Sequence, residues 1–194
     1  GDHRDLHSFP TRRSSDPKRG VLSTISSIFD PLGFVAPVIL EGKLILRSIC
    51  KAGGWDDVLS DDVRPKWEHW RQQLLALTDV SVSRCIKPED FGRIVRAELH
   101  NFADASTKGY CCASYLRLMN QNDDICCSLV MARVRVAPLK MVTIPRLELQ
   151  SAVLASTASA MIEKELDTPV EQHFWTDSTR SEEHTSELQS LTNL

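Results

Sequence analysis

The sequence has 194 residues, of which 42% are hydrophobic and 25% are charged, and its formal net charge is −3. These values are typical of a globular protein with one modest core or two small ones, and they exclude a protein that binds nucleic acid through its overall charge. No apolar run is long enough to cross a membrane and no signal peptide is recognisable, so we expect an intracellular, cytoplasmic protein.

The two ends of the sequence differ from the rest, because residues 1–16 and 180–194 show neither helical nor strand periodicity. Both strings resemble translated adapter DNA from sequencing libraries. We therefore expect both ends to be adapter-derived, not native, and to contribute little to any core. The alternative is a pair of native disordered tails.

The first half of the remaining chain, residues 17–83, reads as helical. Two helices are expected over residues 21–29 and 34–52, separated by a turn at Asp30-Pro31-Leu32-Gly33. A third is expected after Ser60, where apolar residues recur at intervals of three and four: Val63, Trp67, Trp70, Leu74 and Leu77. This stripe predicts a buried core; stacking of the two tryptophans on nucleobases is the alternative.

Residues 84–92 form the expected linker, and the period then changes from helical to extended. Strands are expected over residues 94–103, 110–118 and 125–134, a helix from about residue 144 to 166, and a fourth strand over residues 170–176. The order βββαβ predicts an α/β unit with a mixed sheet, in which the crossing helix lets the last strand pair beside the first.

Six cysteines include two adjacent pairs, Cys111-Cys112 and Cys126-Cys127. Neighbouring strand residues point to opposite faces, so these pairs lack the spacing of a zinc site. We interpret them as small apolar strand residues in a reducing compartment, in preference to metal ligands or disulfides.

Three carboxylates stand at the ends of predicted elements: Asp104 after the first strand, Glu148 early in the helix and Asp177 after the fourth strand. If the strand ends and the helix meet, the three acids gather at one point, and such charge is usually compensated by Mg²⁺ or Mn²⁺. Small residues at helical spacing from Glu148, namely Ala152, Ala155 and Ser159, favour a close approach to the sheet. Simple caps and solvated turns are the alternative.

The acids lie in the motifs Phe102-Ala103-Asp104-Ala105-Ser106, Pro145-Arg146-Leu147-Glu148-Leu149 and Trp175-Thr176-Asp177-Ser178, which resemble the acidic motifs of RNase H domains in reverse transcriptases. Longer strings, KRGVLSTISSIFDPLGFVAP from Lys18, GWDD from Gly54 and RVRVAPLKMVTIPRLEL from Arg133, resemble the polyprotein of BEL/Pao-type LTR retrotransposons. The resemblance covers essentially all of residues 17–179.

This resemblance implies that residues 17–83 are a thumb-like or connecting segment after the polymerase and that residues 93–179 are a truncated RNase H-like domain. It further implies that Asp104, Glu148 and Asp177 are catalytic metal ligands for two Mg²⁺ or Mn²⁺ ions in the hydrolysis of RNA paired to DNA. A fourth acidic ligand of the family has no counterpart in this sequence. The implied partners are an RNA–DNA hybrid and the rest of the polyprotein, with polymerase upstream and integrase downstream, in a virus-like particle.

Residues 125–147 contain no acid but carry four cations expected to contact nucleic-acid phosphates: Arg133, Arg135, Lys140 and Arg146. A solvated basic face is the alternative. His100 and His173 lie within strands, and we expect packed or surface imidazoles there, not catalytic bases.

Two other functions compete with a nuclease. A non-catalytic RNase H-like or connection domain would support the polymerase, and its expected mark is the loss of one acid; all three are present. An aspartic peptidase needs an Asp-Thr/Ser-Gly loop. Neither Asp104 nor Asp177 is followed by that glycine, so the sequence disfavours a peptidase.

Overall fold

The computed structural model describes residues 17–50, 54–83, 85–166 and 169–177. The ends that we expect to be adapter-derived, residues 1–16 and 180–194, lie outside the described residues. The chain divides into two units: the first contains the described residues up to Phe29 together with Pro37–Ser81, and the second contains Asp30–Ala36 and the described residues from Val82 onward.

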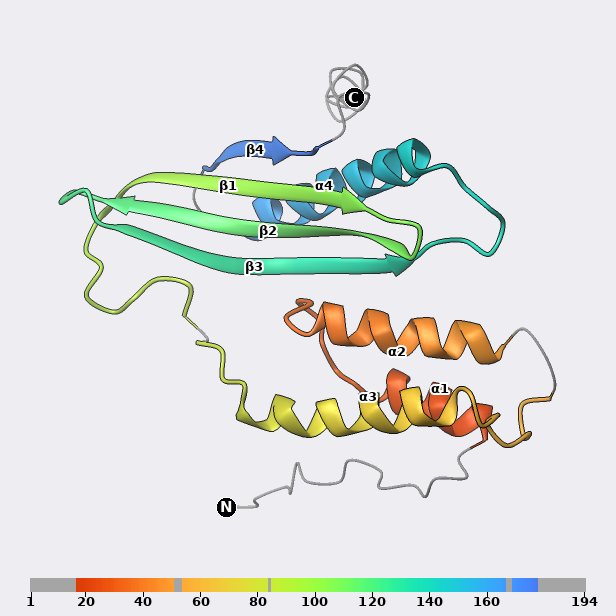
Figure 1. The fold of residues 1–194 in the computed structure, drawn as a ribbon. Coiled ribbons are helices and arrows are strands. Elements are labelled where there is room, and N and C mark those ends of the chain that lie inside the picture. Colours follow the sequence, from red (N-terminus) through yellow and green to blue (C-terminus); the bar gives the residue numbers. More distant parts are fainter. Residues whose placement is uncertain (1–16, 51–53, 84, 167–168, 178–194) are drawn as a thin grey trace. The chain divides into compact units, whose positions relative to one another are not determined.

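The first unit is helical, as the sequence predicts. It consists of α1 (Lys18–Ser26), α2 (Ala36–Ile49) and α3 (Arg64–Ala76), and a 3₁₀ turn at Leu77–Asp79 follows α3 (Figure 1). The rings of Trp67 and Trp70 stack with their centroids 5.1 Å apart and are 1% and 0% exposed. The apolar stripe of α3 is therefore core, and the alternative of a base-stacking platform is wrong.

A close approach between α2 and α3 depends on Gly42. A Cβ at this position would lie 2.5 Å from Cζ2 of Trp70, which is closer than real side chains come. The indole Nε1–H of Trp70 donates a hydrogen bond of 2.8 Å to the carbonyl of Val38, one turn earlier on α2. The missing side chain thus lets a buried indole lie against the α2 backbone and satisfy its only polar group.

The third helix begins later than the sequence suggests. It was expected directly after Ser60, but α3 begins at Arg64, and the carbonyl of Ser60 accepts hydrogen bonds from the amides of Val63 and Arg64. Pro65 lies in the first turn, where its fixed φ fits and no amide hydrogen is needed.

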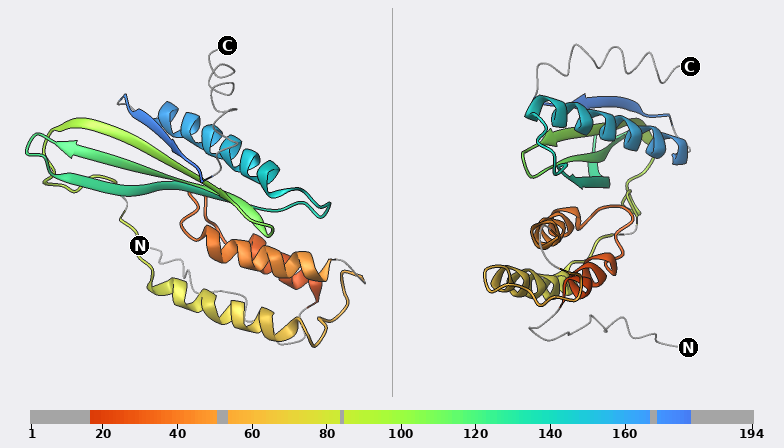
Figure 2. Two further views of the ribbon diagram at one scale, coloured as in Figure 1. Left: turned by 45° about the horizontal axis from the view of Figure 1, so that its top comes forward. Right: turned by 90° about the vertical axis from the view of Figure 1, so that its right-hand side faces the viewer.

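The second unit is a four-stranded sheet with one crossing helix (Figures 1 and 2). Its elements are β1 (Ile94–Ala105), β2 (Gly109–Asn120), β3 (Ile125–Val136), α4 (Ile144–Glu165) and β4 (Glu171–Trp175). The strand order is β3-β2-β1-β4; the first three strands are antiparallel and β4 runs parallel to β1. The predicted α/β class with βββαβ order and a mixed sheet is confirmed.

The core of this unit lies between the sheet and α4. Alternate residues of the central strands point to the helix, among them Leu99 of β1 and Cys112 of β2, and meet Ala155 and Ala158 of α4. Burial raises the pKa of the Cys112 thiol to about 11. Cys111 is only partly buried, in keeping with the alternation of neighbouring strand residues.

The turn that the sequence predicts at Asp30–Gly33 contacts the outer edge of β3 at Ala132. The amide of Ala132 donates a hydrogen bond of 2.7 Å to the carbonyl of Leu32. Gly33 has a φ of +81°, and a Cβ there would lie 1.8 Å from the carbonyl oxygen of Ala132. Only glycine fits this close approach, in which the turn occupies one backbone amide of the edge strand. None of the described helices is long and apolar enough to cross a membrane.

Candidate metal and nucleic-acid site

Asp104 and Asp177 lie at the same end of the sheet. Phe102 of β1 pairs in register with Trp175 of the parallel strand β4, and each acid follows two residues after its member of that pair. Both acids are exposed. By strand alternation the Asp104 side chain shares the sheet face of Phe102, which is the face that α4 does not cover.

Glu148 reaches the same end from α4. It is partly buried, and Ser151, one turn later on the helix, donates hydrogen bonds to the backbone carbonyls of Asp104, at 2.9 Å, and of Cys111. These two carbonyls belong to paired residues of β1 and β2. The serine therefore ties the first turns of α4 to the strand end that carries Asp104.

The three predicted acids share one end of the sheet, but their carboxylates do not form a tight cluster. In the described part of the chain, the ligand atoms of Asp104, Glu148 and Asp177 are not all within 4.8 Å of one another. One oxygen of Asp104 accepts from the amide of Ala105 at 2.8 Å. Burial, and then the charge of Asp104, raise the pKa of the Cys111 thiol. The role of these acids as ligands stays a prediction.

A buried polar network sets the distance between α4 and the sheet. Asn101, Ser114 and Ser159 are each 0% exposed. The Asn101 amide donates to the Ser159 hydroxyl at 2.9 Å and accepts from the Ser114 hydroxyl at 2.6 Å, while Ser159 donates to Gln172 of β4 at 2.7 Å. Ser159 of α4 therefore does more than permit close packing, because its hydroxyl links Asn101 of β1 to Gln172 of β4.

An ion-pair cluster that the sequence analysis missed joins β1, β2 and β4 on the open face. Glu98 is 6% exposed; it accepts from Arg117 at 2.6 Å and lies 2.7 Å from Arg96, which also contacts Glu171 at 3.0 Å. Burial opposes ionisation of Glu98, yet hydrogen bonds from Arg117 and His100 and the two guanidinium charges lower its pKa overall. The cluster is therefore a charged brace across three strands.

The signal for this cluster was a repeated Glu-x-His, at Glu98-Leu99-His100 and Glu171-Gln172-His173. The strands pair Glu98 with Glu171 and His100 with His173. Of the described residues, Glu98, Glu171 and His173 are the group whose ligand atoms lie within 4.8 Å of one another. Two arginines already balance the two carboxylates, so a cation would have to displace them, and the group does not suit a metal.

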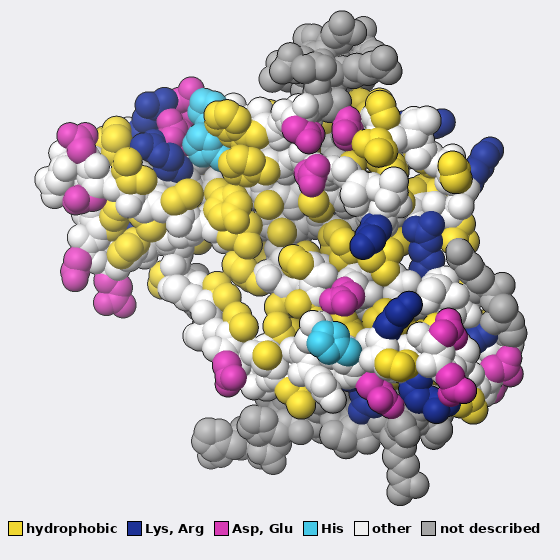
Figure 3. All heavy atoms as spheres, viewed as in Figure 1, with side chains coloured by type: hydrophobic (Ala, Val, Ile, Leu, Met, Phe, Trp, Pro, Cys, Tyr) yellow, Lys and Arg dark blue, Asp and Glu magenta, His cyan; other side chains and the backbone are white. Residues whose placement is uncertain are grey.

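The two histidines continue into a row of aromatic rings. Their centroids lie 4.8 Å apart, and Trp175 donates from Nε1 to Nδ1 of His100 at 3.1 Å. Because Nδ1 accepts, the ring proton of neutral His100 is on Nε2, which faces Glu98 at 3.4 Å. Figure 3 shows histidine, basic and acidic side chains gathered beside hydrophobic ones on this face. The packed imidazoles agree with the expectation for both histidines.

Three of the four predicted cations line one pocket. Arg133 and Arg135 of β3 and Arg146 in the first turn of α4 border a cavity of about 380 Å³ between the helix and the sheet. Lys140 is exposed in the loop between β3 and α4 and does not line it. The pocket face of α4 lies about half a turn around the helix from Glu148, so this cavity is separate from the acidic end of the sheet.

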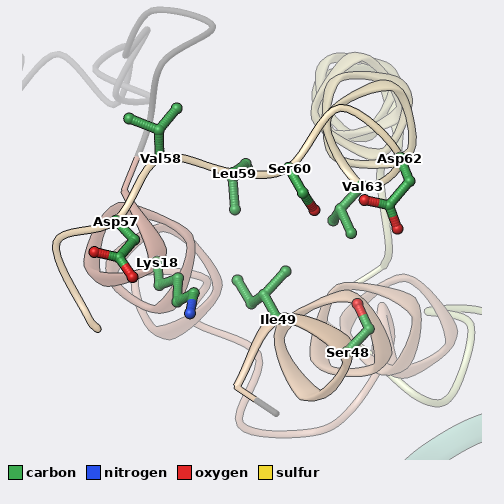
Figure 4. Close-up of a pocket in the computed structure, with 9 residues that line it drawn as sticks. All are labelled: Lys18, Ser48, Ile49, Asp57, Val58, Leu59, Ser60, Asp62 and Val63. Atoms are coloured by element: carbon green, nitrogen blue, oxygen red, sulfur yellow. The ribbon is translucent and has the colours of Figure 1, made fainter. Parts of the chain in front are cut away.

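A second cavity, of about 320 Å³, lies in the helical unit (Figure 4). Lys18 of α1 and Asp57 lie near each other at one side of it, and Ile49, Leu59 and Val63 contribute apolar walls. None of the predicted site residues lines this cavity. Its lining mixes a buried lysine with acids and hydroxyls and points to no single ligand class.

The chain matches a known protein family. The model of a family described as the Pao retrotransposon-like RNaseH-like domain matches residues 17–178. No curated protein matches the chain. The match covers both units and all three predicted acids.

Proposed function

Because this chain belongs to the family of Pao retrotransposon-like RNaseH-like domains, we propose that it is part of a retrotransposon nuclease that hydrolyses the RNA strand of RNA–DNA hybrids during reverse transcription. The observation that carries this proposal is the arrival of Asp104, Glu148 and Asp177 at one end of the sheet, from two parallel strands and the crossing helix.

The donor set suits the divalent metal ions that RNase H-like domains generally use. Carboxylate oxygens are the preferred ligands of Mg²⁺ and Mn²⁺, and all three acids offer them at or near the surface. When bound, two such ions supply an activated water and stabilise the leaving oxygen.

The remaining residues of the site position the acids and the substrate. Ser151 holds the first turns of α4 against the carbonyl of Asp104, which fixes Glu148 relative to β1. Arg133, Arg135, Lys140 and Arg146 supply positive charge on the α4–β3 side, where it would attract the phosphates of either strand without reading sequence.

The same proposal covers the context of the chain. Residues 17–83 would follow a polymerase as a thumb-like or connecting segment, residues 93–179 would form the incomplete nuclease domain, and integrase would follow. The protein would act in the cytoplasm, within virus-like particles. A fourth acidic ligand would come from sequence beyond residue 179, so the chain by itself would bind hybrid without cleaving it.

A non-catalytic domain that supports the polymerase is the second candidate. It is favoured by the spacing of the three acids, which are not all within 4.8 Å of one another among the described residues. An aspartic peptidase has no such support, since neither Asp104 nor Asp177 precedes the required glycine.

Cleavage by a longer native protein separates the two candidates. Genomic DNA across the junction at residue 179 gives the native continuation, and a protein extended through it should cleave the RNA strand of a labelled hybrid in Mg²⁺ or Mn²⁺. Asp104→Asn in that protein should abolish cleavage and spare binding, because it removes a ligand with little change in shape. A folded extended protein that is inert with both metals would favour the non-catalytic domain, and an active Asp104→Asn variant would exclude the named site.

A further inference from the structure

The pocket between α4 and β3 has a positively charged lining that suits an anion. Three guanidinium groups border it, from Arg133, Arg135 and Arg146, and no carboxylate does. Tyr110 and Arg135 are paired residues of β2 and β3, and Arg133 lies two residues before Arg135 on the same face, so the sheet places all three on the side of α4. Arginine forks are suited to phosphate oxygens.

The helical side of the pocket supplies a different chemistry. Arg146, Gln150, Val153 and Thr157 recur at intervals of four, three and four and form one stripe of α4. Leu149, Val153 and Leu154 give the pocket apolar walls, and the ring of Tyr110 also lines it. A phosphate ion would leave these walls unused, whereas a planar base could lie against them.

Gln150 adds a specific requirement. Its Oε1 atom is buried and has no hydrogen-bond partner in the described structure. A buried acceptor without a donor is unfavourable, and buried polar atoms in native proteins are nearly always hydrogen-bonded to protein, water or a bound ligand. A ligand with an N–H donor would satisfy it, and the base-pairing edge of every unpaired nucleobase carries such a donor.

We propose that this pocket binds a single nucleotide unit of a nucleic-acid strand, with its phosphate on the arginines and the N–H edge of its base on Gln150. The cavity of about 380 Å³ lies within the range of roughly 300–1,000 Å³ found for small-molecule sites. The choice of ligand class rests on the proposed function, but the pocket is separate from the acids and needs neither metal nor cleavage. It would hold an unpaired nucleotide beside the nuclease site.

Calorimetric titration of the full chain in the absence of metal tests this pocket. The probes are AMP, ribose 5-phosphate, adenosine and inorganic phosphate at low salt. AMP should bind about tenfold more tightly than ribose 5-phosphate or adenosine, because each lacks one half of the recognised unit. Equal binding of AMP, ribose 5-phosphate and phosphate would overturn the proposal in favour of a simple anion patch, and so would the absence of AMP binding.

Variants assign the binding to named residues. Gln150→Leu, which keeps the volume, should weaken AMP about five- to tenfold and leave ribose 5-phosphate unchanged. Arg135→Gln with Arg146→Gln should weaken both probes at least tenfold, and both arginines are exposed, so folding should be unaffected. Lys164→Gln, an exposed cation on α4 outside the pocket, is the matched control. Undiminished AMP binding by the double variant would place the nucleotide elsewhere and overturn the proposal. An inert extended nuclease would leave these results unchanged.

Discussion

Glu98 shows how one buried carboxylate can be stabilised by its neighbours. Its side chain is almost fully covered, which by itself disfavours the charged form. Arg117, Arg96 and His100 reverse that effect, so that the pKa lies below the ordinary value of 4.5. A carboxyl with a lowered pKa in the folded protein stabilises the fold above its unfolded pKa, and this stabilisation is lost as the pH falls through the folded pKa.

We therefore expect Glu98→Gln to lower the free energy of unfolding by about 2 kcal/mol at neutral pH, since it removes a charged hydrogen-bond partner from buried surroundings. The difference from the unmodified chain should begin to narrow below about pH 4.5, where Glu98 of the unfolded chain takes up a proton, and should be lost as the pH falls through the lower pKa of Glu98 in the folded protein. Urea unfolding followed by circular dichroism from pH 7 to pH 3 measures it.

The exposed Glu163 of α4 provides the control, because Glu163→Gln should change stability little at any of these pH values. A Glu98→Gln difference that stays constant down to pH 3 would contradict the view that ionised Glu98 is stabilised by its arginines.

At the scale of elements, two close approaches among the described residues show how small side chains permit packing. Ala155 and Ser159 let α4 lie directly on β1 and β2, and Gly42 lets Trp70 lie on α2. The first was predictable, because small residues at helical spacing indicate close packing. The second was not, because a glycine inside a helical pattern gives no sign of the partner that requires it.

Gly42→Ala tests the second contact through two opposing effects. Alanine favours a helix by about 1 kcal/mol over glycine, whereas displacing Trp70 costs about 1–3 kcal/mol in packing and about 1 kcal/mol for its hydrogen bond to Val38. The packing cost should exceed the gain in helix propensity, so we expect the free energy of unfolding to fall by about 2 kcal/mol. Urea unfolding followed by tryptophan fluorescence measures it. Gly54→Ala, whose Cβ would come no closer than 3.4 Å to Asp57, should show no such loss. A stabilising Gly42→Ala would refute the packing argument.

At the scale of the whole molecule, the sequence predicted the elements, their order and the mixed sheet, because hydrophobic period and turn residues are local properties. It did not predict the brace around Glu98 or the polar network around Asn101. Both depend on the register of strands that are far apart in sequence, and a shift of one residue would reverse every side chain. The acids were found by their motifs, but their final spacing also depends on register and helix placement.

Net charge offers little attraction for nucleic acid, so any hybrid binding by this chain must come from its local basic surface. We expect weak binding of an RNA–DNA hybrid whose affinity falls with salt, with a slope of log K against log salt of about −3 if Arg133, Arg135, Lys140 and Arg146 meet three to four phosphates. Arg135→Gln with Arg146→Gln should reduce that slope by about 2, and Lys164→Gln should leave it unchanged. Fluorescence anisotropy from 25 to 200 mM salt, roughly, covers the range in which such slopes are measured. The same samples with Mg²⁺ should show no cleavage, because binding needs only the cations whereas hydrolysis needs a complete metal site. A slope that the double variant does not change would mean that the hybrid binds elsewhere on the chain.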